Sequence, residues 1–222
     1  LAFLHAHKPK PVLHRDIKSA NVLLFTNSGT LTAKIADFGL ATGIESKSLE
    51  SSSRQIGGGG LVGTYPYMSP ETWRNEVYRP KSDVYSFGVT LWELLTGEKP
   101  WQVDKHGRDI TNPGVICNFV LRGDRPHLPS NAGPPILNSL VKKCWHKNEH
   151  SRPMFEQLKR QLTMVVEQQR LSHEPRANLP SGDENARAAP REEGRPSIAP
   201  TRAPAPSARS TKITVIAYVD AI

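Results

Sequence analysis

Apolar residues are distributed along the chain in two ways, one typical of helices and one typical of short strands. Residues 82–96 are apolar nearly all round, which is typical of a helix buried on every side. Ser82 is a suitable N-cap residue for this helix, and Gly97 is a suitable C-cap residue. Three further helices are predicted at residues 113–122, 135–145 and 153–168, the last with a proline in its first turn. The second half of the folded region is therefore predicted to be mainly α-helical.

Near the start of the chain, short apolar runs alternate with polar segments. Residues 22–25 are expected to form a short buried strand, and residues 31–36 have a strand-like composition. A polar octapeptide at residues 14–21, His-Arg-Asp-Ile-Lys-Ser-Ala-Asn, comes directly before the first strand, and Asp-Phe-Gly at residues 37–39 follows the second. A short β-hairpin would therefore carry both polar segments.

These two polar segments contain side chains that suit phosphoryl transfer. Asp16, Lys18 and Asn21 place a carboxylate, an ammonium group and a carboxamide within six positions. Such a set can accept a proton from a hydroxyl group, neutralise a transferring phosphoryl group and hold a divalent metal ion. Asp37 adds a second carboxylate for the metal. The alternative interpretation of the octapeptide is a polar turn between two core strands.

The octapeptide and the Asp-Phe-Gly segment together resemble the signature motifs of protein kinases. The resemblance implies ATP and Mg²⁺ as cofactors and proteins as substrates. Asp16 would orient the substrate hydroxyl and accept its proton, and Lys18 would stabilise the γ-phosphoryl group of ATP. Asn21 and Asp37 would hold Mg²⁺ against the ATP phosphates.

Residues 63–71, Gly-Thr-Tyr-Pro-Tyr-Met-Ser-Pro-Glu, resemble the substrate-docking loop of the same family. Thr64 together with Lys18 is similar to the serine/threonine type of kinase, in which a threonine hydroxyl bridges the catalytic Asp and Lys. Residues 18–21 and 152–158 are most similar to the tyrosine-kinase-like branch. The resemblance therefore implies phosphorylation of Ser and Thr residues on protein substrates.

Arg15 would, in the resembled family, bind a phosphate group on the activation segment. Residues 46–53 contain several serines that could accept this phosphate. A phosphate group adds about −1.5 to −2 charge and strong acceptor oxygens, enough to order a segment through arginine contacts. An upstream kinase or trans-autophosphorylation would supply it.

Three further residues would have structural roles in the resembled fold. Asp83 would anchor the backbone of the catalytic loop, although the helix dipole alone also favours an acid in a first helical turn. Arg152 would pair with Glu71 and tie the docking loop to the helical part of the domain.

The resemblance covers residues 1–168 and implies a mainly α (α+β) fold. This is the large helical C-lobe of a protein kinase, with a short β-hairpin that carries the catalytic and Asp-Phe-Gly segments. The small N-lobe is expected to be absent, because its Gly-rich loop, strand Lys and helix Glu are not in the sequence. Residues 169–210 are rich in Pro, Arg and Ala and are expected to be disordered. Residues 211–222 are a short apolar segment without an assignment.

The overall composition narrows the expected partners and location. The formal net charge is +8, but the basic residues are spread out without a basic run or interleaved aromatics, so no nucleic-acid partner is expected. Two cysteines cannot form a disulfide framework, and a reducing, cytoplasmic setting is expected. No apolar run has the length of a membrane span, although a spanning segment upstream of this chain stays an open alternative.

Two functions stay open from the sequence. The first is an active Ser/Thr kinase, which the presence of all four chemical side chains favours. The second is a non-catalytic scaffold or decoy binding module, which the missing N-lobe favours. The chain alone is expected to be inactive, because ATP in the resembled fold binds between two lobes.

Overall fold

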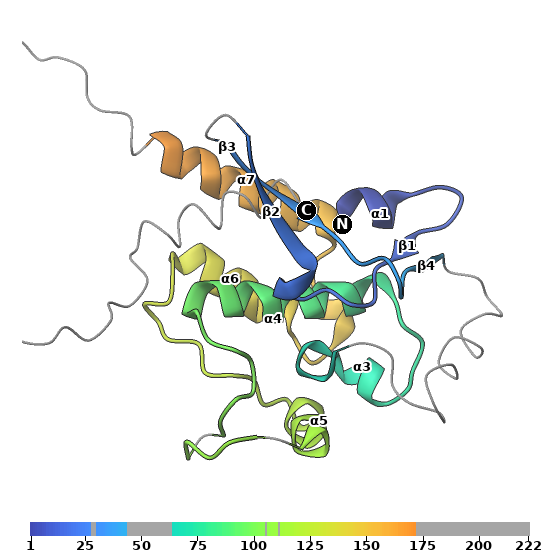
Figure 1. The fold of residues 1–222 in the computed structure, drawn as a ribbon, viewed down its shortest axis with the longest axis vertical. Helices are drawn as coiled ribbons and strands as arrows, with labels where there is room; N and C mark the ends of the chain where they lie inside the picture. The colour runs from blue at the N-terminus through green and yellow to red at the C-terminus, as the bar shows by residue number, and fades with distance from the viewer. Residues whose placement is uncertain (28–29, 44–63, 105, 111, 172–222) are drawn as a thin grey trace, which may run out of the picture.

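The computed structural model describes residues 1–27, 30–43, 64–104, 106–110 and 112–171 (Figure 1). Its α-helices are α1 (Ala2–Ala6), α3 (Pro70–Trp73), α4 (Pro80–Thr96), α5 (Pro113–Arg122), α6 (Pro135–Cys144) and α7 (Phe155–Leu171). Its strands are β1 (Val12–Leu13), β2 (Val22–Asn27), β3 (Thr30–Ile35) and β4 (Thr42–Gly43), and its short 3₁₀ helices are Ser19–Asn21, Tyr65–Tyr67 and Glu149–Ser151. The serines at 46–53, residues 172–210 of the predicted disordered tail and the apolar segment at 211–222 lie outside the described residues. Residues 169–171, also predicted to be disordered, belong to α7 instead.

Strands β2 and β3 form an antiparallel hairpin in which Val22 pairs with Ile35. Strand β1 pairs with β4 through Val12 and Gly43. The register of the β2–β3 hairpin brings the residues just before β2 beside those just after β3. The two polar segments that carry the expected chemistry therefore meet at one end of the hairpin.

The prediction of a buried strand at residues 22–25 is wrong in one respect. The strand exists, but Leu23, Leu24 and Phe25 keep 47%, 49% and 46% of their surface exposed. Within the described residues the β2–β3 sheet has two strands, and so small a sheet covers little of its own side-chain surface unless another layer packs on its faces. An apolar run alone does not reveal how much of it the fold covers.

Helix α4 is the centre of the hydrophobic core. Val84, Tyr85 and Val89 have no exposed surface. A Cβ atom added at Gly88 would lie 2.7 Å from the Cβ of Cys144 on α6, so only glycine allows the two helices to approach this closely. In Figure 1, α4 crosses the middle of the domain, with α7 and the β2–β3 hairpin on one side and α3 and α5 on the other.

Helix α4 begins earlier than predicted. Its N-cap residue is Arg79 and its first residue is Pro80, whose fixed φ suits the first helical position. Ser82 is therefore the third helical residue rather than the N-cap, and its hydroxyl accepts a hydrogen bond from the Arg79 N–H (3.3 Å). The predicted end at Gly97 is confirmed, with φ of 71° in the left-handed region.

The three later helices follow the predicted order with small shifts. Helix α5 has the predicted bounds, and α6 ends at Cys144, one residue before the predicted end. Helix α7 begins at Phe155, so Pro153 is not in its first turn. The carbonyl group of Met154 accepts two N–H groups of the first turn (3.0 and 3.1 Å), which sets the start of the helix after Pro153. Helix α7 continues to Leu171, past the predicted end at 168.

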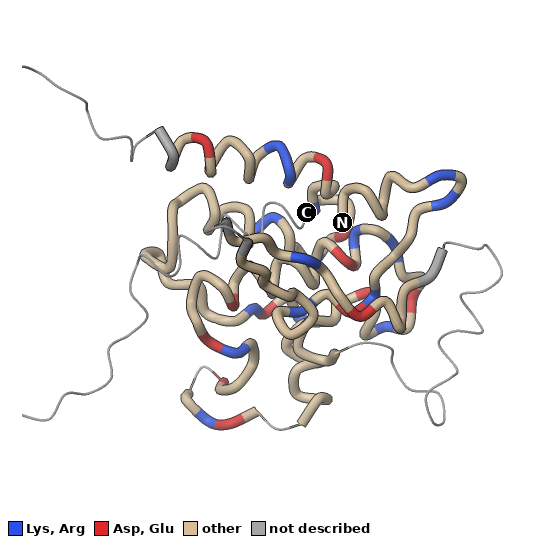
Figure 2. The backbone as a smooth tube through the Cα atoms, turned by 45° about the horizontal axis from the view of Figure 1, so that its top comes forward, with Lys and Arg blue, Asp and Glu red and all other residues tan. Residues whose placement is uncertain are grey.

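Acidic and basic residues are interspersed along the described backbone rather than gathered by sign (Figure 2). On α7, for example, Glu156 and Arg160 pair across one helical turn at 3.5 Å. Among the helices of the described residues, none combines the length and the apolarity that crossing a membrane requires.

Candidate active site

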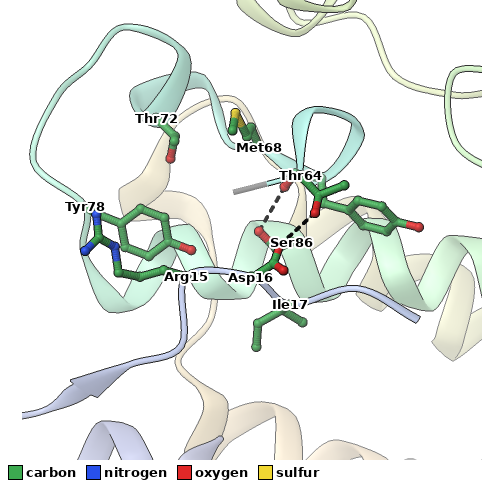
Figure 3. Close-up of a pocket in the computed structure, with 9 residues that line it drawn as sticks. Arg15, Asp16, Ile17, Thr64, Met68, Thr72, Tyr78 and Ser86 are labelled. Carbon is green, nitrogen blue, oxygen red and sulfur yellow. Dashed lines mark hydrogen bonds between the residues drawn. The ribbon is translucent and has the colours of Figure 1, made fainter. Parts of the chain in front are cut away.

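Residues 14–21 lie between β1 and β2 and are called the catalytic loop here after the kinase motif that they resemble. They meet the docking loop at Thr64. The Thr64 hydroxyl donates a hydrogen bond to Oδ1 of Asp16 (2.7 Å), and the Lys18 ammonium group donates one to Oδ2 (2.6 Å). Lys18 also donates to the Thr64 hydroxyl oxygen (2.9 Å). These three side chains form a closed ring of contacts, which we call the Asp16 triangle. Figure 3 shows Thr64 and Asp16 facing each other.

The Asp16 triangle keeps its carboxylate ionised at neutral pH. Burial raises the pKa of Asp16, but hydrogen bonds from Lys18, Thr64 and Asn21 outweigh burial and hold the pKa below its ordinary value. Asp16 is 8% exposed, so these donors replace most of its water. The Lys18 side chain is more open, at 22% exposed, so its charge remains accessible to an anionic group.

Asn21 is fixed by its amide nitrogen. This nitrogen donates to the backbone carbonyl of Asp16 (2.8 Å) and to its Oδ2 atom (3.0 Å). Since the nitrogen faces Asp16, the carboxamide oxygen points to the other side of the Asn21 side chain. That oxygen is a hard ligand of the kind that Mg²⁺ prefers.

Asp37 lies at the same end of the hairpin as Asn21. The N–H group of Ala36, the preceding residue, donates to the carbonyl oxygen of Asn21 (2.8 Å). Asp37 is exposed, has φ of 63°, and accepts the Gly39 N–H at Oδ1 (3.2 Å). Among the described residues it makes no hydrogen bond or ion pair with the Asp16 triangle.

The donor atoms at this end of the hairpin fit Mg²⁺. Asn21 offers one carboxamide oxygen and Asp37 offers the carboxylate oxygen that Gly39 does not use. Mg²⁺ usually binds through one or two protein oxygens together with water and substrate phosphates. In the described ranges, no group of three or more His, Cys, Asp or Glu side chains forms a metal cage, so a nucleotide or water would complete the coordination.

Asp83 on α4 is completely buried and holds the backbone of the catalytic loop. Its Oδ2 atom accepts the His14 N–H and its Oδ1 atom accepts the Arg15 N–H, each at 2.9 Å. His5 contacts Oδ2 through Nε2 (2.8 Å), and the Tyr78 hydroxyl donates to Oδ1 (2.8 Å). Burial raises the pKa of Asp83, but the contacts from His5 and the loop N–H groups hold it below its ordinary value.

The sequence pointed to Asp83 as the anchor of the catalytic loop but not to His5 or Tyr78. His5 is 78 positions from Asp83, and Tyr78 lies in the irregular segment between α3 and α4. Burial and the charge of Asp83 raise the pKa of Tyr78 well above its ordinary value, so Tyr78 is a neutral hydrogen-bond donor. No sequence motif links either residue to the loop.

Arg15 lines a small pocket together with Asp16 and Tyr78 (Figure 3). Arg15 has φ of 71°, and its guanidinium carbon lies 5.7 Å from the centre of the Tyr78 ring. The Nε atom of Arg15 is buried and has no hydrogen-bond partner among the described residues. The serines expected to carry a phosphate for Arg15 lie outside the described residues.

The Glu71 carboxylate, at the end of the docking loop, is held by Arg152 and Ser82. Arg152 donates to both carboxylate oxygens of Glu71 (2.7 and 2.9 Å), and the Ser82 hydroxyl donates to Oε1 (2.7 Å). We call these three residues the Glu71 lock. Burial raises the pKa of Glu71, but the hydrogen bonds and charge of Arg152 outweigh it and lower the pKa to about 2. Arg152 is 1% exposed.

Comparison with known proteins agrees with these motifs. The sequence pattern of the family described as protein tyrosine and serine/threonine kinase matches residues 1–162. The chain belongs to the protein kinase family. The match runs from α1 into α7 and includes the Asp16 triangle and the Glu71 lock.

Three relatives illustrate the range of the family. The kinase is 35% identical over 178 residues to mitogen-activated protein kinase kinase kinase 10 of Mus musculus, covering 78% of this chain and 17% of the relative. It is 36% identical over 172 residues to a putative serine/threonine-protein kinase/receptor of Acanthamoeba polyphaga mimivirus, covering 75% of this chain and 9% of the relative. It is 36% identical over 155 residues to seven transmembrane domain-containing tyrosine-protein kinase 1 of Dictyostelium discoideum, covering 69% of this chain and 20% of the relative.

The kinase thus spans only 9% to 20% of the length of these relatives. Membership of the family supports protein phosphorylation in general, with ATP and Mg²⁺ as the cofactors that the family typically uses.

Proposed function

We propose that residues 1–168 form the large, catalytic lobe of a serine/threonine protein kinase of the tyrosine-kinase-like branch. The observation that carries this proposal is the Asp16 triangle, in which the Thr64 hydroxyl contacts both Asp16 and Lys18. The triangle joins the docking loop to the catalytic carboxylate, so the position of the substrate depends on the same contacts as the position of the base. The serine/threonine assignment rests on the resemblance of this pairing, since the relatives are named for either class.

Asp16 is the proposed base, and Lys18 the proposed stabiliser of the transferring group. Asp16 orients the substrate hydroxyl and accepts its proton. Its lowered pKa makes it a weak base, which suits a loose transition state with little bond formation to the attacking oxygen. The Nζ atom of Lys18 lies 2.6 Å from Oδ2 of Asp16. Its fixed positive charge stabilises the negative charge that accumulates on the transferring phosphoryl group.

Asn21 and Asp37 are the proposed Mg²⁺ ligands. Bound Mg²⁺ would neutralise charge on the phosphate oxygens of ATP. The contact of the Asn21 amide nitrogen with Asp16 presets the direction of the carboxamide oxygen. Asp37 contributes its carboxylate from the end of β3, on the same side of the hairpin.

The exposed apolar surface of strand β2 supports a nucleotide cleft beside the hairpin. Leu23, Leu24 and Phe25 are about half exposed on alternating faces of the strand, and we place the nucleotide and a small N-terminal lobe against this strand. Orientation of reactants contributes about 7–11 kcal/mol to lowering a barrier. The 222-residue chain by itself is therefore proposed to transfer phosphate poorly.

The proposed partners are protein substrates and an activating kinase. The mouse relative is named as a kinase in a kinase cascade, so another protein kinase is the substrate class that we propose. Arg15 is proposed to receive an activating phosphate, since its buried Nε lacks a partner among the described residues. The proposed location is the cytoplasm.

Transfer of radiolabelled γ-phosphate from ATP to serine, threonine and tyrosine peptides tests the proposal on the full-length protein that contains this chain. Asp16→Ala should lower turnover by about 10²–10⁴-fold, the range for loss of a general base. Asp124→Ala is the matched control, because Asp124 pairs with Arg122 in an exposed position (2.9 Å). Near-normal turnover in Asp16→Ala would refute the assigned base. Transfer to tyrosine alone would refute the specificity, and partner binding without any transfer would favour the scaffold alternative.

A further inference from the structure

Tyr78 lies between the catalytic loop and α4, although it belongs to neither. It precedes α4 in the segment that follows α3 and is 8% exposed. Figure 3 shows its ring alongside the Arg15 side chain. The phenol therefore lines the pocket that also includes the proposed base.

Tyr78 is linked to Arg15 in two ways, to its backbone through Asp83 and to its side chain directly. Its hydroxyl donates to Oδ1 of Asp83 (2.8 Å), the same oxygen that accepts the Arg15 N–H (2.9 Å). Its ring lies against the Arg15 guanidinium group, whose carbon is 5.7 Å from the ring centre, within the range of a cation–π contact. The hydroxyl thus acts on the backbone of Arg15 and the ring acts on its side chain.

Arg15 needs such support because of its backbone conformation. Its φ of 71° lies in the left-handed region, which is unfavourable for a residue with a Cβ atom. Asp16 is the next residue, so a relaxation of Arg15 toward negative φ would turn the Asp16 carboxylate away from Lys18 and Thr64. Asp83 opposes this relaxation by holding the Arg15 N–H, and Tyr78 in turn fixes Asp83.

We infer that Tyr78 is a positioning residue for Asp16, acting through Asp83 and the backbone of Arg15. The inference rests on the proposed function, because it takes Asp16 as the base. The Tyr78 hydroxyl keeps Oδ1 of Asp83 aimed at the Arg15 N–H, and the ring keeps the guanidinium group beside the pocket. Tyr78 acts on Asp16 only through Asp83 and Arg15 in this inference, so its loss should affect turnover rather than binding.

The test uses three variants of the full-length protein. Tyr78→Phe removes the hydroxyl and keeps the ring, whereas Tyr78→Leu removes both. Tyr85→Phe is the matched control, because Tyr85 is also buried, on α4, and its hydroxyl has no partner among the described residues. We expect kcat to fall about tenfold in Tyr78→Phe and about 100-fold in Tyr78→Leu, since small misplacements of a catalytic group have effects of this size. KM for Mg·ATP and for peptide should stay within about twofold, and Tyr85→Phe should match the wild type.

Amide hydrogen exchange gives a second readout that does not depend on activity. Tyr78→Phe should speed exchange at the His14 and Arg15 amides, with little change in α4, and Tyr85→Phe should not. Unchanged kcat together with unchanged exchange at these amides would overturn the inference, as would a loss of thermal stability with normal kcat per folded molecule.

An Asp16→Asn variant measured in parallel separates this inference from the proposed function. If wild-type activity does not depend on Asp16, the proposed function fails, and the exchange rates alone decide whether Tyr78 holds the loop. If activity depends on Asp16 but not on Tyr78, only the inference fails.

Discussion

Asp16 and Glu71 are carboxylates with the same kinds of partner in different surroundings. Each accepts hydrogen bonds from one cation and one hydroxyl, Lys18 and Thr64 for Asp16, and Arg152 and Ser82 for Glu71. Each also has a pKa below its ordinary value. In the Asp16 triangle the cation side chain is 22% exposed, and in the Glu71 lock it has no exposed surface.

The difference in exposure matches the roles proposed for the two sets of groups, catalysis for the Asp16 triangle and structure for the Glu71 lock. Arg152 uses both terminal nitrogens on Glu71 and its remaining N–H groups on backbone carbonyls, so it has little capacity for a further ligand. Lys18 makes two contacts with a flexible ammonium group that a phosphate can approach. Changes in the Glu71 lock should therefore affect stability, and changes in the Asp16 triangle should affect turnover.

The largest effect on stability is expected from Arg152→Met. This change leaves the buried Glu71 carboxylate without its cation, which typically costs about 3–5 kcal/mol of folding free energy. Urea unfolding should show this loss, and activity should fall only with the folded fraction. Arg160→Met is the control, because Arg160 forms an exposed pair with Glu156 and should change stability by less than about 1 kcal/mol. Equal stability of the two variants would show that the buried Arg152–Glu71 pair contributes no more to folding than the exposed Arg160–Glu156 pair.

Acid should also weaken the Glu71 lock. The pKa of Glu71 is about 2 in the fold and ordinarily 4.5. Since the folded value is the lower one, the stabilisation is complete above about pH 4.5 and is lost as the pH falls toward 2. Its size is about 3 kcal/mol. Urea unfolding at pH 7, 5, 4 and 3 measures it, with Glu71→Gln as the control. If Glu71→Gln lost as much stability as the wild type between pH 5 and pH 3, Glu71 would not be the responsible group.

Lys18→Met should produce the opposite pattern in the Asp16 triangle. Turnover should fall about 10²–10³-fold, as when a preorganised charge is removed from a transition state. The unfolding free energy should change by about 1 kcal/mol or less, because the Lys18 side chain is partly exposed. Lys99→Met is the matched control, since Lys99 pairs with Glu93 (3.1 Å) and is 64% exposed. A variant that loses stability but keeps turnover would reverse the proposed assignment of the two centres.

The smallest of these effects is expected at Thr64. Thr64→Val keeps the shape and removes the hydroxyl, and kcat/KM for a peptide should fall about tenfold, the equivalent of one hydrogen bond to a charged group. Thr64→Ser should retain most of the activity because it keeps the hydroxyl. Steady-state kinetics on both variants measures the contribution of the Thr64 hydroxyl to kcat/KM. Equal loss in Thr64→Ser and Thr64→Val would show that the hydroxyl has no role.

Residues that stand in contiguous motifs were the most predictable part of the site. Asp16, Lys18 and Asn21 are close in sequence, so the loop itself brings them together. Thr64 and Arg152 are distant from their carboxylates, and only the resemblance to protein kinases suggested these contacts. The helix ending at Gly97 was predictable because a glycine with positive φ is a strong local signal.

Features that depend on several distant segments were not predictable. The sequence suggested Ser82 as an N-cap, but Pro80 moved the helix start and left the Ser82 hydroxyl to bind Glu71. The apolar run of β2 gave no sign that its side chains would stay half exposed. The contact of Tyr78 with Asp83 joins an irregular segment to a helix, and such segments have no periodicity to read.

The donors that converge on Asp83 also have a consequence for the order of folding. Three of them lie 68, 69 and 78 positions from it in the chain. Contacts at such separations require closure of long loops and tend to form slowly. Helices such as α4 and α7 need only local hydrogen bonds. We therefore expect helical circular dichroism to recover early during refolding and enzymatic competence to recover last, when α1, the catalytic loop and α4 have assembled around one buried charge.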